Sequence, residues 1–269
     1  MFFIHHSSFC IHPYSSMSHV WQLRAAQFLL PKDGAAAAEC EDAIGVNVAA
    51  GRFAVADGAT EAFDARSWAQ RLAEGWVATD APVLTTEAFN NWVAEQGSAL
   101  HESWAGRALP WYAEEKAQRG SFAAFVGVQF ETGNGLPSWT ALALGDSCLI
   151  QQRGREIERA LPVSDHRQFT STPVLVPSRN QWHEAALGQL QVERGSFAPG
   201  DVLWLLSDAT AEWFLRCAAE RDATALARLN NFLAHDRAAE TVALFQEQRR
   251  ARRIKDDDVA IIRITLAGD

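Results

Sequence analysis

The spacing of apolar residues along this chain changes in blocks, and strand-like and helix-like segments do not alternate regularly. Strand-like runs come first, helical stretches follow, and then strands, helices and a final strand complete the order. The strand-like runs cover residues 19–30, 44–48, 52–56, 122–130, 139–144, 148–153, 202–207 and 259–266, and helical spacing covers residues 61–76, 87–118 (as two helices), 209–219 and 223–250. Residues 162–194 show few clear periods. This grouping predicts an α+β fold, in which an antiparallel β-sandwich is flanked by helices on both sides.

Composition and charge exclude several classes of protein. The formal net charge of −9 argues against a nucleic-acid partner, which would require a basic face. The one basic cluster, residues 249–255, adjoins three aspartates and is interpreted as a solvated helix end rather than a site for polyanions. No apolar run reaches the roughly 18 residues that would span a membrane. The four cysteines lie far apart, as is typical of reduced structural thiols, so the expected location is cytoplasmic.

Residues 1–17 differ from the rest of the chain. They contain no basic segment followed by a continuous apolar run, so they do not have the pattern of a signal peptide. Metal binding is one interpretation of the residues His5, His6, Cys10 and His12. The interpretation that we favour is a disordered or misannotated N-terminal extension, with Met17 as the true start. A single domain is then expected over residues 18–269, since the sequence shows neither an internal repeat nor a linker.

Several strand-like runs begin or end at an aspartate. These residues are Asp57 in FAVADGATEAF, Asp146 in ALALGDS, Asp208 in VLWLLSDATAEW, Asp42 before the run at 44–48, and Asp257 before the last strand. Carboxylates at strand ends can meet at one edge of a sandwich although they are far apart in sequence. A group of oxygen ligands without thiolate or imidazole suits a hard cation such as Mg²⁺ or Mn²⁺. The pattern therefore suggests a metal site.

Each aspartate taken alone has a simpler interpretation. Asp208 precedes a helical segment and could be its N-cap, Asp57 could form a β-turn with Gly58, and residues 256–258 could be a solvated acidic turn. The run of three aspartates also leaves the register of the ligand open by one residue. Gly58 agrees with the metal interpretation, because a residue without Cβ lets a backbone carbonyl or a water molecule come close to an ion.

The order of these motifs resembles that of a known family. CEDAIG, FAVADGATE, GSFAAFVGV, LALGDSCLI, GDVLWLLSDATAE and DDDVAIIRI follow one another as in the metal-dependent protein phosphatases, the PPM or type-2C family. The resemblance extends from about residue 42 to residue 264, and although each motif is short, the ordered set is specific. It implies a four-layer αββα fold and a serine/threonine protein phosphatase that uses Mn²⁺ or Mg²⁺.

The resemblance also implies a role for each acidic residue. Asp57 would bridge two metal ions, and Asp57 and Asp208 would be catalytic through metal-bound water. The ligands would be Asp208 and Asp257 at the first ion, Glu41 and Asp42 at the second, partly through water, the carbonyl of Gly58, and Asp146 at an additional, weaker metal site. No cysteine or serine nucleophile would then be required.

Two groups that eukaryotic members of the family use are missing here. No arginine lies within residues 34–40, where such members carry one that binds phosphate, and Ala59 stands where they have a histidine proposed as a general acid. Thr60, His166 and Arg167 are the candidates for contacts with the substrate. Ala209 replaces a common glycine after Asp208, a change that is tolerable if the local φ is negative.

Three functions stay open at this point. The first is dephosphorylation of serine and threonine in phosphoproteins, with a cognate serine/threonine kinase as a further partner, as in bacterial relatives. The second is a catalytically weak or inactive pseudophosphatase that serves as a binding or regulatory module. The third is hydrolysis of a small phosphorylated metabolite at the same site. We expect substrate choice to depend on residues 87–118 and 162–194.

Overall fold

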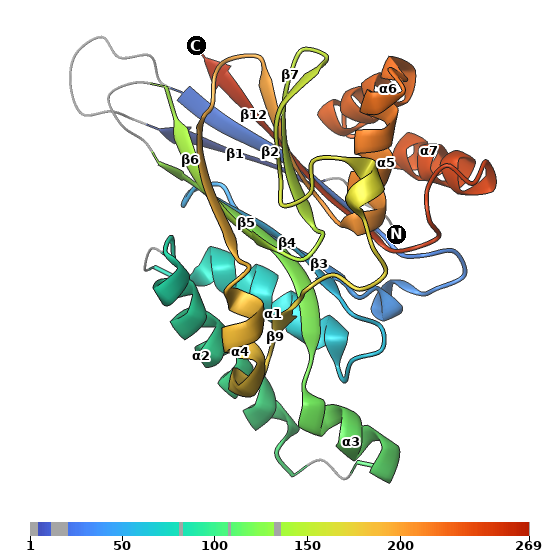
Figure 1. The fold of residues 1–269 in the computed structure, drawn as a ribbon. Coiled ribbons are helices and arrows are strands. Elements are labelled where there is room, and N and C mark those ends of the chain that lie inside the picture. Colours follow the sequence, from blue (N-terminus) through green and yellow to red (C-terminus); the bar gives the residue numbers. More distant parts are fainter. Residues whose placement is uncertain (1–4, 12–20, 81–82, 107–108, 132–135, 269) are drawn as a thin grey trace.

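Two antiparallel sheets form the centre of the protein (Figure 1), whose computed structural model describes residues 5–11, 21–80, 83–106, 109–131 and 136–268. The first sheet has the spatial order β1 (His5–Ile11), β2 (Trp21–Leu30), β12 (Val259–Gly268), β11 (Asp201–Leu206), β7 (Cys148–Arg153) and β8 (Glu156–Leu161). The second has the order β10 (Gln191–Ser196), β6 (Ser138–Leu144), β5 (Phe122–Glu131), β4 (Arg52–Gly58) and β3 (Asp42–Asn47), and the short β9 (Val176–Pro177) pairs with β5.

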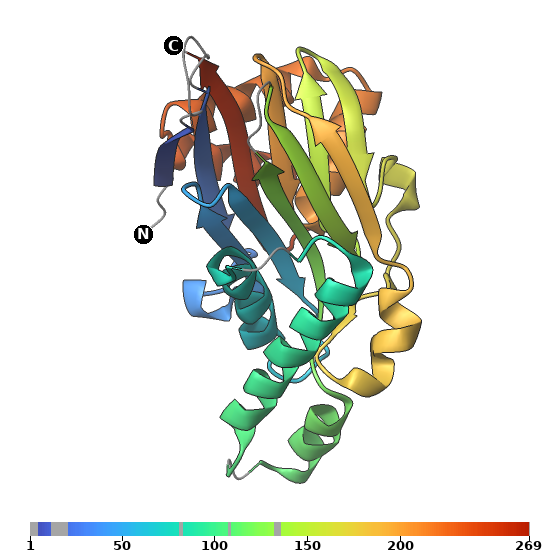
Figure 2. The same ribbon diagram turned by 90° about the vertical axis from the view of Figure 1, so that its left-hand side faces the viewer.

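Helices lie on the outer side of each sheet (Figures 1 and 2). On the side of the second sheet lie α1 (Ala65–Ala78), α2 (Thr86–Trp104), α3 (Trp111–Arg119) and α4 (His183–Leu187). The first sheet is covered by α5 (Asp208–Ala219), α6 (Ala223–Ala234) and α7 (Ala238–Arg250). Single 3-10 turns occur at η1 (Ala37–Glu39), η2 (His166–Gln168) and η3 (Asn180–Trp182). The predicted four-layer αββα sandwich is confirmed. Among the described helices, none is long and apolar enough to cross a membrane.

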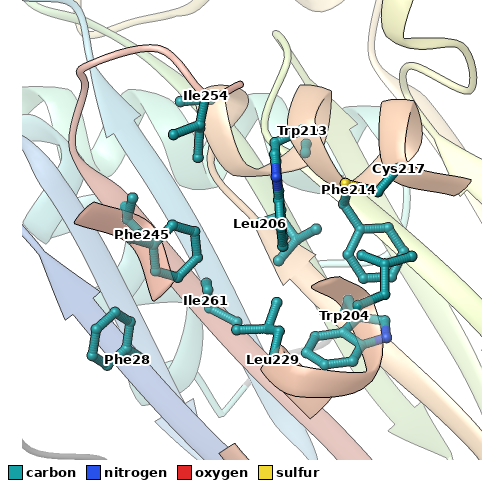
Figure 3. Packing of buried hydrophobic residues seen from close by; sticks show 14 of the residues in the cluster. Phe28, Trp204, Leu206, Trp213, Phe214, Cys217, Leu229, Phe245, Ile254 and Ile261 are labelled. Atoms are coloured by element: carbon teal, nitrogen blue, oxygen red, sulfur yellow. The ribbon is translucent and has the colours of Figure 1, made fainter. Parts of the chain in front are cut away.

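Three apolar layers hold these elements together. Val55 and Ile262 belong to the layer between the two sheets, and Trp76 of α1 belongs to the layer outside the second sheet. Figure 3 shows the third layer, in which Trp204 of β11 and Trp213 of α5 belong to one cluster between the first sheet and its helices. The central strands are therefore buried on both faces, which explains why their sequences are nearly continuous apolar runs.

The strands β8 and β10 lie in or beside the part of the sequence where no strand is predicted. Both are edge strands, and most of their side chains are partly or fully exposed. Arg159 of β8 forms an ion pair with Glu193 of β10, with 3.7 Å between Nη1 and Oε2. Charged side chains are typical of edge strands, because they discourage pairing with another chain. The same charges remove the apolar period from which a strand is predicted.

Other boundaries also differ from the predicted ones. Residues 223–250 form two helices rather than one continuous stretch, because the chain turns at Asp236, whose φ is +56°. α1 begins at Ala65 rather than at residue 61, after Asp64 at φ +53°. His5–Ile11, within the segment expected to be disordered, forms the strand β1 beside β2. The division of the chain at residue 17 stays a prediction.

Two helical glycines provide a test of the packing around α2. A Cβ at Gly97 would lie 2.2 Å from the carbonyl oxygen of Ser178, whereas a Cβ at Gly75 would lie 2.9 Å from the flexible end of Gln96. We expect Gly97→Ala to destabilise the protein by about 1–3 kcal/mol, because backbone has to move. Gly75→Ala is the matched control and should be neutral or stabilising, by up to about 1 kcal/mol. Urea unfolding of both variants measures the difference, and equal effects would contradict this packing.

Candidate metal centre

Two acidic residues of the second sheet lie directly opposite each other. Asp42 of β3 pairs in register with Asp57 of β4. Directly paired residues of an antiparallel ladder have their Cβ atoms about 4.5–5.5 Å apart and on the same face. Both aspartates are therefore within the strands, not in the turns after them, and the ladder continues with a hydrogen bond of 3.2 Å from the N–H of Gly58 to the carbonyl of Glu41.

The first sheet adds two more carboxylates at the same edge. Asp208 is the first residue of α5 after β11, and Asp257 lies two residues before Val259, where β12 begins. β11 and β12 are paired, with Leu206 opposite Ile261, so these two aspartates lie at the same end of the sheet. The charge of Asp208 acts on Asp57, so the acidic ends of the two sheets lie near each other. Asp146 lies in the loop that leads from β6 in the second sheet to β7 in the first.

The pKa values show that these carboxyl groups act on one another. Desolvation raises the pKa of Asp57 well above its usual value, and the negative charges of Asp42, Asp208, Asp146 and Asp257 raise it further. Desolvation is also the largest cause for Asp42, whose pKa is raised by neighbouring aspartates and lowered by a hydrogen bond from Ser207. Five carboxylates from separate elements are thus gathered in one desolvated group that carries excess negative charge.

Two further members of the group, Asp146 and Asp208, show the same effect. Burial raises the pKa of Asp146 to about 7, with a further contribution from the charge of Asp208 and an opposing one from Lys255. Burial, followed by the charge of Asp257, raises the pKa of Asp208. Such values mean that this edge of the sandwich takes up protons when nothing else neutralises the carboxylates.

The residues fit hard cations by their chemistry. Asp42 is buried, and in the described structure its Oδ2 atom has no hydrogen-bond partner. Buried carboxylate oxygens normally have partners, so this one calls for a cation or another donor. No set of three or more His, Cys, Asp or Glu side chains in the described ranges has the spacing of a ready-made metal site. The group therefore contains oxygen atoms of the kind that Mn²⁺ or Mg²⁺ prefers, although in the described ranges they do not have the spacing of a formed metal site.

The three consecutive aspartates have different partners. Asp258 is buried, and its carboxylate accepts hydrogen bonds from the N–H groups of Lys32 at 2.8 Å and Glu41 at 2.7 Å. Asp256 accepts a hydrogen bond of 2.9 Å from the N–H of Asp33. Asp257 accepts one of 2.9 Å from the N–H of Asp258 through Oδ1, and it is the member of the run whose charge acts on Asp57 and Asp208.

Arg249 holds this acidic loop in place. Its side chain is buried and donates hydrogen bonds to the carbonyl of Pro31 at 3.2 Å, to Oδ1 of Asp33 at 2.9 Å and to the carbonyl of Asp257. The interpretation of residues 249–255 as a solvated helix end is therefore wrong for Arg249. The solvated acidic turn considered for residues 256–258 is likewise wrong for Asp258. A buried guanidinium and a buried carboxylate form the support of the loop.

Glu41, Thr60 and Gly58 lie beside the group. The hydroxyl of Thr60 donates a hydrogen bond of 2.6 Å to Oε2 of Glu41, whose side chain is 21% exposed. A Cβ on Gly58 would lie 2.7 Å from the carbonyl oxygen of Ala65, so close packing of α1 against β4 is reason enough for a glycine here. Ala209 lies within α5 and does not have a positive φ, which is the condition under which its methyl group is tolerated.

The structure does not bring His166 and Arg167 to the acidic group. Arg167 is exposed and forms an ion pair with Asp165, which lowers the pKa of that carboxyl. Both candidates line a hollow together with residues 215 and 218–220 at the C-terminal end of α5. Asp208 is at the opposite end, and at 1.5 Å per residue the separation along the helix is roughly 10–18 Å.

A second hollow adjoins Asp146 itself. Its volume is about 190 Å³, and its lining includes Val163, Gln168, Thr170 and Gln191 from the section with few sequence periods. Asp146 is the one charged residue of this lining. Several residues of the section 162–194, which the sequence analysis expects to influence substrate choice, therefore line a hollow beside Asp146.

The cysteines do not provide a nucleophile. Cys148 and Cys40 are buried beside the acidic group, and burial raises the pKa of both thiols, with an added contribution from neighbouring carboxylates. Burial likewise raises the pKa of Cys217 to about 11. A nucleophilic cysteine needs a lowered pKa, because the thiolate is the reactive form. Cys40, Cys148 and Cys217 are therefore structural, as predicted.

Comparisons with known proteins support the same fold. No protein-family model and no curated protein matches the sequence. Among solved structures, the catalytic domain of the serine/threonine protein phosphatase PstP in complex with two manganese ions superposes with a TM-score of 0.58 at 17% identity, covering 92% of this chain and 99% of that one. The serine/threonine phosphatase Stp1 from Staphylococcus aureus gives 0.58 at 16% identity, with 91% and 95% covered.

A third structure is PppA, described as a key regulatory component of the T6SS in Pseudomonas aeruginosa, with a TM-score of 0.53 at 20% identity and 91% and 98% of the chains covered. At these identities the similarity establishes the fold. The chain has the fold of the PPM-type serine/threonine phosphatases over most of its length, and the sequence resemblance is confirmed at that level.

The stability of the metal-free protein should fall as the pH rises. The folded-state pKa values of Asp42, Asp57, Asp146 and Asp208 lie above their unfolded values, so the contribution of these groups is fully present below about pH 4 and is lost as the pH passes the folded pKa, about 7 for Asp146. We expect the Tm to be at least about 5 °C lower at pH 8 than at pH 5.5, and Mn²⁺ to reverse the fall at pH 8. Asp146→Asn should reduce the difference in Tm between pH 5.5 and pH 8. A Tm that does not change with pH or with Mn²⁺ would contradict the repulsion.

Two neighbouring aspartates should respond to the same substitution in opposite ways. Asp258→Asn removes an acceptor from a buried carboxylate that binds two N–H groups, so it should destabilise the metal-free protein by about 1–3 kcal/mol. Asp257→Asn relieves repulsion and should leave that stability unchanged or raise it. Urea unfolding of both variants is the measurement, and a greater loss in Asp257→Asn would refute the division of roles.

Proposed function

We propose that the protein is a metal-dependent phosphatase that hydrolyses phosphoserine and phosphothreonine esters in proteins. The observation that carries the proposal is the group of mutually repelling carboxylates at one edge of the sandwich, with the buried Oδ2 of Asp42 left without a partner. The resemblance in fold to a phosphatase domain in complex with two manganese ions agrees with it.

The charges favour a central position for Asp57 among the ligands. The pKa of its carboxyl is raised by the charges of all four of the other aspartates, from both sheets. In the proposal Asp57 would be shared by two ions, Asp208 and Asp257 would hold the first, and Asp42 and Glu41 would hold the second. Gly58 adds its carbonyl, and Asp146 supports a weaker additional site. When bound, two such ions would activate water and neutralise charge on the transferring phosphoryl group.

The protein fixes the orientation of these side chains through its own hydrogen bonds. Ser207 is buried, accepts a hydrogen bond of 3.0 Å from the N–H of Ala260 and bonds to the carboxyl of Asp42. The hydroxyl of Thr60 likewise orients Glu41, because it donates a hydrogen bond to Oε2 of that residue. Carboxylates that are oriented before the ion arrives lose less conformational freedom on binding, and they keep the ion in one position during the reaction.

Substrate, partners and location belong to the proposal as well. A phosphoprotein substrate and a cognate serine/threonine kinase are expected by analogy with the phosphatases of this fold, and a bacterial source and a cytoplasmic location are expected from the sequence. The alternative functions are a pseudophosphatase that acts as a binding module, and a phosphatase for small metabolites. The retained carboxylate group favours an enzyme, because a binding module has no need to collect repelling charges.

Activity assays should show hydrolysis that depends on the metal and on Asp57. With Mn²⁺ or Mg²⁺ present, the protein should hydrolyse p-nitrophenyl phosphate and a phosphothreonine peptide. Asp57→Asn should lower kcat/KM by more than about 100-fold, since even residues that only support a metal ligand cost 10–100-fold. Asp236→Asn makes the same chemical change at an exposed position between α6 and α7 and should have no effect.

The same protein preparations separate the proposal from its alternatives. Calorimetry of Mn²⁺ binding should show two sites in the wild type and a loss of affinity in Asp57→Asn. Binding of two ions without hydrolysis of either substrate would favour the pseudophosphatase. Hydrolysis of p-nitrophenyl phosphate and of small phosphate esters, but of no phosphopeptide, would favour the metabolite enzyme.

A further inference from the structure

A single lysine faces the acidic group from the loop between α7 and β12. The Nζ atom of Lys255 lies 3.7 Å from Oδ2 of Asp208 and 3.1 Å from Oε2 of Glu212. Asp208 and Glu212 are four residues apart on α5, so they lie on the same face of that helix. The side chain of Lys255 is 48% exposed, whereas those of its two partners are 17% and 19% exposed. The ammonium group therefore lies at the border between the carboxylates and the solvent.

The charge of Lys255 acts on the centre of the group. In the described structure it is the cation that opposes the negative charges at Asp208 and Asp146. The other lysine nearby, Lys32, lies 3.8 Å from Oε2 of Glu41, at the edge of the group. A phosphate monoester is itself an anion and has to approach five carboxylates, so a positive charge directed at their centre favours its binding.

The two partners of Lys255 differ in what happens to them in the proposed enzyme. Asp208 is a proposed metal ligand, and a carboxylate that coordinates an ion becomes a weaker partner for an ammonium group. Glu212 is not among the proposed ligands and stays available at 3.1 Å. With ions bound, Lys255 would thus be released from Asp208 but still be held at the rim of the site by Glu212, with hydrogen-bond donors free for another anion.

We propose that Lys255 binds the phosphoryl oxygens of the substrate. This inference rests on the proposed phosphatase function and adds to it the residue that recognises the phosphate. His166 and Arg167 do not serve this purpose, because they line the hollow at the far end of α5. An ammonium group on a flexible side chain suits a phosphate as a point charge and does not need a planar, two-point contact.

Calorimetry with two probes, Mn²⁺ and inorganic phosphate, tests the inference on the full chain. Lys255→Met should weaken phosphate binding to the Mn²⁺-loaded protein about tenfold, as expected for loss of a charged hydrogen bond. The same variant should bind Mn²⁺ equally well or about two- to fivefold tighter, because a cation no longer competes for Asp208. A purely structural role would weaken both, so a loss of affinity for phosphate without a loss of affinity for Mn²⁺ identifies a phosphate contact.

Matched variants sharpen the comparison. Lys255→Arg keeps the charge and should restore most of the phosphate affinity. Lys32→Met removes a lysine with a similar ion-pair distance, and Arg228→Met removes a cation that pairs with Glu247 between α6 and α7. Both should change the phosphate affinity less than twofold. With p-nitrophenyl phosphate, Lys255→Met should raise KM about tenfold and also weaken inhibition by phosphate.

The outcomes distinguish this inference from the proposed function. If Lys255→Met binds phosphate within twofold of the wild type, or if Lys32→Met has the larger effect, the assignment to Lys255 is wrong while the phosphatase function stands. If the wild type binds Mn²⁺ and phosphate with the predicted dependence on Lys255 but hydrolyses no ester, the function is wrong and the phosphate contact stands. A wild type without Mn²⁺-dependent phosphate binding overturns both.

Discussion

Desolvated carboxylates that repel one another lie at one edge of the sandwich, and the pairing of the strands keeps them there. Asp42 and Asp57 are fixed opposite each other by the register of β3 and β4, while Asp208 and Asp257 come from the paired strands of the other sheet. The two sheets cannot move apart to separate these residues without exposing the apolar layer between them. The fold thus holds together charges that would otherwise separate, which is the arrangement expected of a site completed by cations.

In the loop before β12, charged residues that support the loop alternate with charged residues of the acidic group. Asp256 and Asp258 bind backbone N–H groups, the buried Arg249 binds the carbonyl of Asp257, and the charge of Asp257 acts on Asp57 and Asp208. Next to this run, Lys255 reaches α5. Residues of one short segment therefore alternate between supporting the loop and forming the site, and substitutions at adjacent positions have different consequences.

The sequence was sufficient to predict the sandwich, because its central strands are buried on both faces and their apolar runs are nearly unbroken. It was also sufficient to select Asp42, Asp57, Asp146, Asp208 and Asp257, since a carboxylate at the boundary of such a run is conspicuous. The structure places these five together, while their roles as ligands stay a prediction. The order of the motifs supplied the resemblance that the fold confirms.

What the sequence did not provide depends on contacts between distant segments. β8 and β10 lack an apolar period because they are edge strands with charged side chains. Asp258 and Asp257 are indistinguishable as neighbouring letters, and only the N–H groups of Lys32 and Glu41 separate their roles. The burial of Arg249 is not visible in the sequence, because Pro31 and Asp33, two of its partners, lie more than 200 positions away. The sequence does not identify Lys255, because its proposed role depends on its ion pairs with Glu212 and Asp208.

A crystal structure of the protein grown with Mn²⁺ would show whether the clustered aspartates bind two ions. We expect two ions at the edge of the sandwich, with the carboxylate of Asp57 between them, Asp208 and Asp257 on one ion, and Oδ2 of Asp42 directed at the other. Lys255 should have left Asp208 and kept its contact with Glu212. An ion-free edge in which Asp57 is bonded only to protein atoms, or a single ion elsewhere on the surface, would contradict the account.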